Sequence, residues 1–313
     1  MALVTPPPSL PARGMPALVA LSALVAAGLL AFFLPFLADL PLPWAVAAVA
    51  VYLLGHVLRG VRLAILSIDL LGLSGRTAAL MHLVTAPMAL AMPLKSGEIL
   101  RWHQLWRLGG SAVYAVIVLL IERMFDALFL VPILVLLLAR DSAPGALTVL
   151  TLLAATVPPI VLGLGPKLLT ETQRYMVVNH DSPGALPLLR HVDALRLLVA
   201  RAARVTRSRA PELSLLSCLI WLCEIAVCVI LVAAISGPGP GLAERALDLM
   251  GLRLVAPVWD VGASALAGAA IAAGFVALLL PWPVLVLAYL LRLRRAEPGR
   301  VSALGPAGPG TPP

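Results

Sequence analysis

Residues 213–236 read LSLLSCLIWLCEIAVCVILVAAIS, a continuous apolar run with a single charged residue, Glu224. A helix needs about 20 consecutive apolar residues to cross the hydrocarbon core of a bilayer. The strands of an outer-membrane barrel alternate apolar and polar residues, and this run does not alternate. The stretch therefore predicts a membrane-spanning helix.

The composition of the whole chain also indicates a membrane protein. Of its 313 residues, 61% are hydrophobic and 12% are charged, and the mean hydropathy is +1.01. A soluble domain of this length needs more polar surface to cover its core. The net charge of +8 does not indicate nucleic-acid binding, because Lys and Arg lie between the apolar runs and at their ends, where membrane orientation places them.

Cysteine, metal and nucleotide patterns predict no cofactor. Cys218, Cys223 and Cys228 lie in one apolar run at steps of five residues, which spreads them around a helix. We therefore expect buried apolar side chains here rather than a disulfide or a metal site. No metal-ligand spacing and no nucleotide-binding loop stands elsewhere in the sequence.

Six apolar runs are long enough to cross a membrane: about 15–38, 43–66, 111–139, 145–166, 213–236 and 262–291. A shorter run at about 78–93 lies between Arg76 and Lys95, and we expect it to be a re-entrant or short helix held inside the bundle. The predicted fold class is an all-α integral membrane protein, a polytopic helical bundle of about six crossings plus this short helix.

The distribution of basic residues predicts the orientation. With the N-terminus inside, the inner loops and tails hold 17 Lys and Arg residues, and the outer loops hold three: Arg140, Arg245 and Arg253. Because basic loops stay on the cytoplasmic side, we expect a multi-pass protein of the cytoplasmic membrane with both termini cytoplasmic.

One transmembrane bundle, residues 15–296, accounts for most of the chain. Residues 168–212 form a basic insert, in which apolar residues recur at helical spacing opposite a cluster of arginines. This pattern predicts an amphipathic helix on the inner leaflet or, alternatively, a solvated linker helix. The Pro- and Gly-rich segments 1–14 and 297–313 predict disordered cytoplasmic tails.

Charged residues at bilayer depth cost about 2.5–3.5 kcal/mol each, so they need partners or a wet cavity. The first such group lies in residues 93–101, PLKSGEILR. Pro93 ends one short helix and Gly97 permits a turn, so both are predicted helix breaks. Lys95 supplies a positive charge, and Glu98 and Arg101 share a helical face and can pair.

A second group lies deep in the run 111–139. Glu122 and Asp126 project from one helical face, and Arg123 can pair with Asp126. Two carboxylates and one guanidinium imply a basic partner elsewhere, for which Lys95 or Arg101 is the natural candidate. The alternative interpretation is a buried ion-pair lock that fixes the register of the helices.

Two further places are secondary candidates. His56, Arg59 and Arg62 form a basic stripe near the cytoplasmic end of the second crossing, where helix-end arginines can also extend to lipid headgroups. Glu224 has no basic neighbour within a helical turn. It is therefore either protonated or directed into the bundle, as a structural hydrogen-bonding group or as part of a pathway.

The order Pro-x-Lys-x-Gly-Glu-x-x-Arg, followed about twenty residues later by Glu-Arg-x-x-Asp, resembles the flippase-like transmembrane family, which includes the membrane domain of lysylphosphatidylglycerol synthases. The matching positions are Pro93, Gly97, Glu98, Arg101, Glu122, Arg123 and Asp126. This resemblance implies a lipid-translocating or lipid-handling module whose charged residues line a cavity open to headgroups.

The resulting hypothesis is a transporter rather than an enzyme, with membrane lipids as its partners. Three cations would contact the phosphate of an anionic or zwitterionic lipid and three carboxylates would orient them: Lys95, Arg101 and Arg123, and Glu98, Glu122 and Asp126. One rival is a membrane-embedded transferase that uses such a carboxylate as general base on a lipid-linked substrate. Another is a non-transporting scaffold whose insert recruits a partner. The chain could also form a homo-oligomer or act beside a partner membrane enzyme.

Overall fold

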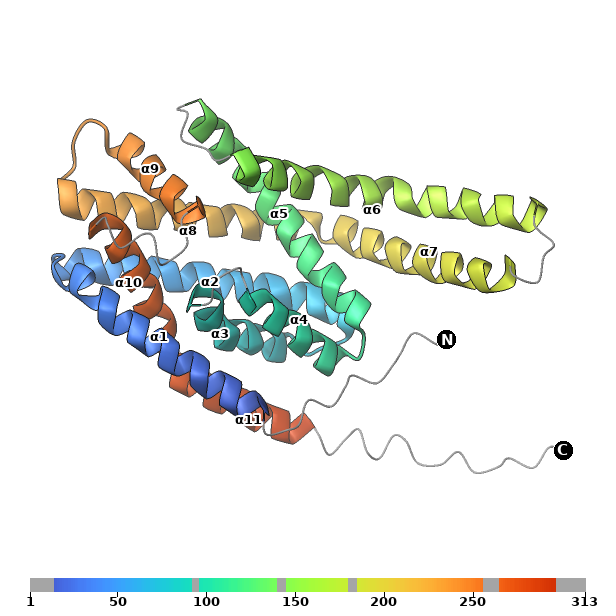
Figure 1. The fold of residues 1–313 in the computed structure, drawn as a ribbon, viewed down its shortest axis with the longest axis horizontal. Helices are drawn as coiled ribbons and strands as arrows, with labels where there is room; N and C mark the ends of the chain where they lie inside the picture. Colours follow the sequence, from blue (N-terminus) through green and yellow to red (C-terminus); the bar gives the residue numbers. More distant parts are fainter. Residues whose placement is uncertain (1–13, 92–95, 140–144, 180–184, 256–264, 297–313) are drawn as a thin grey trace.

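The computed structural model describes residues 14–91, 96–139, 145–179, 185–255 and 265–296, and these residues form eleven α-helices (Figure 1). Their bounds are α1 Gly14–Ala38, α2 Leu42–Leu71, α3 Gly75–Ala91, α4 Ser96–Gly109, α5 Ala112–Leu138, α6 Gly145–Asn179, α7 Ala185–Ser208, α8 Ala210–Ser236, α9 Leu242–Val255, α10 Ala265–Leu279 and α11 Trp282–Ala296. The described part of the chain contains no strand, so the expected all-α fold is confirmed. Residues 1–13 and 297–313, most of the two predicted tails, lie outside the described residues.

Four helical segments are long and apolar enough to cross a membrane. They are Leu42–Leu71, Thr148–Asn179, Ala210–Ser236 and Ala265–Leu291. Two other expected crossings form helices of sufficient length, α1 with 25 residues and α5 with 27. However, α5 carries Glu122, Arg123 and Asp126 in its middle, and the described apolar part of α1 is the shorter stretch Ala27–Ala38. The chain therefore has the helices of a membrane protein.

The last expected crossing is interrupted where α10 ends and α11 begins. Leu280 and Pro281 separate the two helices, because proline has no backbone N–H to continue the helical hydrogen-bond ladder. Helix α10 is rich in Ala and Gly, and most of its residues are buried. Small residues let helices approach closely, and Gly274 accordingly lies against the ring of Tyr52 in α2.

Helices α6 and α7 form a hairpin that extends beyond the other helices at one end of the molecule (Figure 1). Helix α6 continues past Pro166 to Asn179, so the crossing expected at 145–166 and the start of the insert at 168 are one helix. Helix α7 runs back along α6, with Val199 packed against Gly165. Residues 168–179 and 185–208 of the predicted insert thus form one end of an antiparallel hairpin.

The base of this hairpin is fixed to the end of α2. Only Arg209 separates α7 from α8, and its Nε lies 2.9 Å from Oδ2 of Asp69. Arg201 donates a hydrogen bond to the backbone carbonyl of Asp69 (3.0 Å). These contacts attach the start of α8 to the helix beside which it packs.

Two apolar cores lie along the bundle, and charged residues of α2 and α8 lie between them. On α2, Tyr52 belongs to one core and Leu63 to the other. On α8, Val227 belongs to the first core and Leu213 to the second. Arg59 and Arg62 of α2 and Glu224 of α8 lie between these points.

Candidate functional site

Arg62 of α2 is the centre of a buried ion-pair cluster. Its side chain is 1% exposed, and its Nη1 lies 2.6 Å from Oδ1 of Asp126 and donates to Oγ of Ser217 (2.7 Å). Its Nε lies 3.6 Å from Oε1 of Glu122. Arg62 thus joins α2, α5 and α8, because both carboxylates stand on α5 and the serine on α8.

Two further arginines complete the cluster. Nη1 of Arg101 lies 3.4 Å from Oε2 of Glu122, so the basic partner expected from Arg101 is present. Arg123 contacts Oδ2 of Asp126 at 3.1 Å, as its sequence spacing predicts. Its Nη2 lies 2.9 Å from Oε1 of Glu98, so Glu98 of α4 pairs with α5. We call Arg62, Glu98, Arg101, Glu122, Arg123 and Asp126 the central ion cluster.

The central ion cluster is neutral, and it is closed around Arg62, Arg101 and Glu122 but open at Arg123 and Glu98, whose side chains are 38% and 28% exposed. Its three guanidiniums balance its three carboxylates. The side chains of Arg62 and Glu122 are each 1% exposed and that of Arg101 is 6% exposed. Buried ion pairs of this kind fix the positions of the helices that carry them, because loss of either partner leaves an uncompensated buried charge. At Arg101 and Glu122 the geometry agrees with the interpretation of a buried ion pair that fixes the register of the helices.

Of the two predicted helix breaks, Gly97 lies within helix α4 rather than in a turn. Pro93 and Lys95 fall outside the described residues. Gly97, in the first turn of α4, is buried against Ala89 of α3, and a Cβ at this position would overlap the Ala89 backbone. Glycine is therefore required here for close approach of the two helices.

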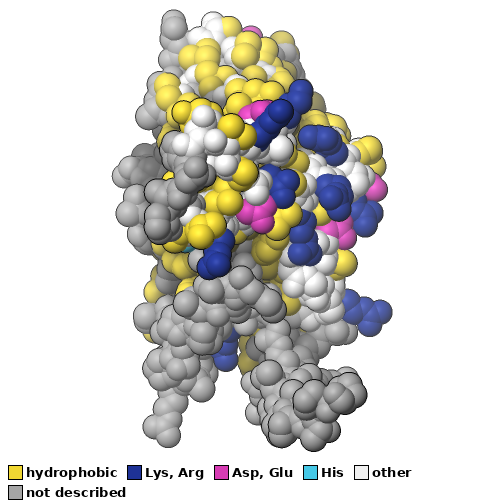
Figure 2. Space-filling view, turned by 90° about the vertical axis from the view of Figure 1, so that its right-hand side faces the viewer, with side chains coloured by type: hydrophobic (Ala, Val, Ile, Leu, Met, Phe, Trp, Pro, Cys, Tyr) yellow, Lys and Arg dark blue, Asp and Glu magenta, His cyan; other side chains and the backbone are white. Residues whose placement is uncertain are grey.

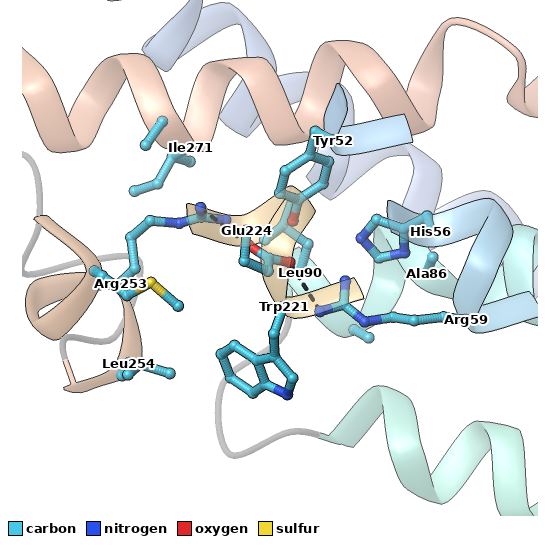
Figure 3. A pocket seen from close by; sticks show the side chains of 13 residues that line it. Tyr52, His56, Arg59, Ala86, Leu90, Trp221, Glu224, Arg253, Leu254 and Ile271 are labelled. Carbon is cyan, nitrogen blue, oxygen red and sulfur yellow. Dashed lines mark hydrogen bonds and ion pairs between the residues drawn. The ribbon is translucent and has the colours of Figure 1, made fainter. Parts of the chain in front are cut away.

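A partly open cavity of about 310 Å³ lies next to this cluster (Figure 3). We call it the Glu224 cavity, and its lining residues are Tyr52, His56 and Arg59 of α2, Ala86, Ala89 and Leu90 of α3, Trp221 and Glu224 of α8, Met250, Arg253 and Leu254 of α9, and Ala270 and Ile271 of α10. Seven residues, or about 10 Å of helix, separate Glu224 from Ser217 on α8. The cavity and the central ion cluster are therefore neighbours along the same helices.

Glu224 is held between two arginines that reach it from opposite sides (Figure 3). Nη2 of Arg59 lies 2.8 Å from its Oε1, and Nη1 of Arg253 lies 3.1 Å from its Oε2. The Arg253 guanidinium also lies over the ring of Tyr52, 5.4 Å from its centroid. Of the two alternatives for Glu224, these contacts agree with a group directed into the bundle.

The charged groups of the cavity are accessible, unlike Arg62. The side chains of Arg59, Glu224 and Arg253 are 21%, 14% and 18% exposed. Two guanidiniums and one carboxylate leave a surplus of one positive charge among the described residues that line the cavity. Each guanidinium has five N–H donors, more than Glu224 can accept. The arrangement can therefore bind an anion.

Neutral polar groups on the cavity wall have no partner within the described part of the chain. Both ring nitrogens of His56 are buried without a hydrogen bond, and so is Nε1 of Trp221. His56 stacks on His82 of α3, with centroids 5.7 Å apart, and the nitrogens of His82 are likewise unpartnered. The ring nitrogens of His56 and Trp221 therefore have hydrogen-bonding capacity that the described residues do not use.

Sequence reasoning included His56, Arg59 and Glu224 as secondary candidates but missed Arg253. Arg253 was counted among the residues of an outer loop, whereas α9 brings it into the bundle. The available signal was its position on α9: Ala246, Leu249 and Met250 are buried, and Arg253 follows at the same helical spacing. An arginine on the apolar face of a helix indicates a buried partner.

No family model, curated protein or solved structure matches this chain. Among the described residues, no group of three or more His, Cys, Asp or Glu side chains could hold a metal ion. The fold and the site together define an all-helical protein with four segments able to span a membrane, and with a positively charged cavity between its helices.

Proposed function

We propose that this chain is a flippase-like protein of the cytoplasmic membrane that binds the headgroup of an anionic lipid in the Glu224 cavity and moves it between leaflets. The observation that carries the proposal is the pair of accessible arginines around one carboxylate, near the middle of the apolar helix α8. A surplus positive charge at this depth is costly unless an anion accompanies it. The remaining lining residues are mostly Ala, Leu, Ile and Met, which suit the apolar part of a lipid.

The proposal assigns different tasks to the two charged groups. Arg59 and Arg253 contact the lipid phosphate, since their side chains are accessible and retain free donors. Arg101 and Glu122 hold the helices in place, because they are buried in a neutral cluster. The transferase alternative is less well supported, because Glu122 and Asp126 are each paired with arginines and so are poor general bases.

The test is translocation of fluorescent phosphatidylglycerol in proteoliposomes, measured by quenching of the outer leaflet. We expect Arg59→Ala and Arg253→Ala each to slow translocation by about tenfold, the loss of one charge-assisted hydrogen bond to phosphate. Each variant leaves Glu224 with one arginine, so we expect folding to persist in a thermal unfolding measurement.

The matched control is Arg190→Ala with Arg204→Ala, two exposed arginines of α7 outside the cavity. We expect this variant to translocate lipid at the wild-type rate. Wild-type rates for both cavity variants would contradict the assignment of the site.

We further propose about six crossings, with α1 and α5 joining the four apolar segments, and with the far end of the α6–α7 hairpin in the cytoplasm. Figure 2, which looks onto the end of the molecule where the hairpin lies, shows Lys and Arg side chains gathered there. Basic segments remain on the cytoplasmic side, which supports this orientation for both termini as well.

Cysteine labelling tests the orientation. In a variant with Cys218, Cys223 and Cys228 replaced by alanine, we expect Val178→Cys at the end of α6 to react with a membrane-impermeant maleimide only after the cells are permeabilised. Val178 is 72% exposed. We expect Gly239→Cys, in the exposed loop between α8 and α9, to react in intact cells. The reverse labelling pattern would invert the proposed topology.

A further inference from the structure

The carboxylate of Glu224 uses both of its oxygens, one for each arginine. Oε1 meets Arg59 of α2 and Oε2 meets Arg253 of α9. Glu224 is thus the internal counter-ion of the cavity, and it neutralises one of its two positive charges. The charge that remains for a ligand to neutralise depends on this one residue.

The single surplus positive charge of the cavity limits the charge that a ligand can carry. A headgroup with one negative charge brings the described lining residues and ligand to neutrality while Glu224 keeps its place. A headgroup with two negative charges leaves one uncompensated charge among apolar walls, next to a carboxylate. Uncompensated charge is costly in a region of low dielectric, and like charges in contact discriminate strongly against the wrong ligand.

The free donors of the cavity agree with a singly charged phosphodiester. Two non-bridging oxygens of a phosphodiester can accept from the unused N–H groups of Arg59 and Arg253. His56 and Trp221 also line the cavity, and their ring nitrogens have no hydrogen-bond partner in the described part of the chain. None of these additional groups supplies the second surplus positive charge that would neutralise a phosphomonoester dianion.

We propose that Glu224 is a specificity-determining residue that restricts the cavity to lipids with one net negative charge, namely phosphodiesters with an uncharged headgroup, and excludes phosphomonoester dianions. This inference rests on the proposed function, because it assumes that an anionic lipid occupies the cavity. Glu224 discriminates through repulsion: its charge opposes any anionic ligand, and it opposes a dianion about twice as strongly as a monoanion.

The experiment measures binding of two short-chain lipids, dihexanoyl phosphatidylglycerol and dihexanoyl phosphatidic acid, to the full chain in detergent by calorimetry. At pH 8 the phosphomonoester is a dianion, since its second pKa is about 6. We expect wild-type protein to prefer the phosphodiester by about tenfold. Glu224→Gln raises the surplus to two positive charges, which favours both anions. We expect it to tighten binding of the phosphomonoester about tenfold more than binding of the phosphodiester, and so to abolish the preference.

Glu212→Gln is the matched control, because Glu212 stands on the same helix, pairs with Arg209 at 3.6 Å and is 47% exposed. We expect it to keep the wild-type preference. Glu224→Asp keeps the charge and is expected to keep the preference as well. A second probe, glycerophosphoglycerol without acyl chains, separates a lipid site from a site for a free phosphodiester: we expect it to bind at least tenfold more weakly than the lipid, as loss of the buried chains requires.

The outcomes separate the inference from the function on which it rests. If wild-type protein binds neither lipid, the proposed function fails. If it binds both lipids equally, or prefers the phosphomonoester, the charge limit is wrong, even where Glu224→Gln does not fold. If Glu224→Gln folds and keeps the wild-type preference, Glu224 is not the residue that sets it. If the deacylated headgroup binds as well as the lipid, the cavity serves a soluble phosphodiester and the assignment to lipids is wrong.

Discussion

Arg62→Ala is expected to lower the free energy of unfolding by about 3–5 kcal/mol, the usual cost of removing one partner from a buried ion pair. Arg62 is 1% exposed and contacts Asp126, Glu122 and Ser217. Without it the central ion cluster has three carboxylates and two guanidiniums, and Ser217 loses its donor. The measurement is thermal or denaturant unfolding of the purified protein in detergent.

Two further variants serve as controls for Arg62→Ala. Arg196→Ala breaks the pair with Asp193 on α7, where both side chains are more than a third exposed, and we expect a loss below about 1 kcal/mol. Arg62→Lys retains the charge but replaces a planar fork with a single ammonium group, so we expect an intermediate loss. Equal stability of Arg62→Ala and wild type would show that the central ion cluster does not hold the helices together.

Local sequence patterns predicted the helices and the pairs that lie within one helix. The apolar run at 213–236 lies within α8, and the run at 111–139 corresponds to α5. The spacing of Arg123 and Asp126 predicted their contact, which is confirmed. The sequence also indicated that Glu122 needs a basic partner, because the charge of an isolated helix would not balance.

The identities of the partners from other helices were harder to predict, because they depend on how the helices pack. Arg62 and Asp126 are 64 residues apart, and Arg59 and Glu224 are 165 apart. No spacing rule relates such positions. Arg253 was missed for a different reason: the count of loop charges placed it in an outer loop, whereas the short helix α9 folds back against α8. The apolar spacing of Ala246, Leu249 and Met250 indicates the buried face of α9, but it does not say which residue Arg253 meets there.

Gly97→Ala is expected to lower the free energy of unfolding by about 1–3 kcal/mol, although alanine favours helices. A Cβ at this position would overlap the backbone of Ala89, and backbone atoms cannot rotate away as a side chain can. The matched control is Gly163→Ala in α6, where nothing lies within 4 Å of the added methyl group. There we expect a gain of roughly 0.5–1 kcal/mol. Opposite signs in thermal unfolding would establish that α3 and α4 need the close approach.

The same substitution connects Gly97 to the site. Ala89, the residue that Gly97 contacts, also lines the Glu224 cavity. A methyl group on Gly97 must displace α3, and with it one wall of the cavity, so we expect Gly97→Ala to slow lipid translocation by about tenfold, as small misplacements at binding sites commonly do. Gly163→Ala should leave translocation unchanged. If Gly97→Ala lost stability but kept the wild-type translocation rate, the wall formed by α3 would not contact the lipid, and the binding surface would have to lie on α2, α8, α9 and α10.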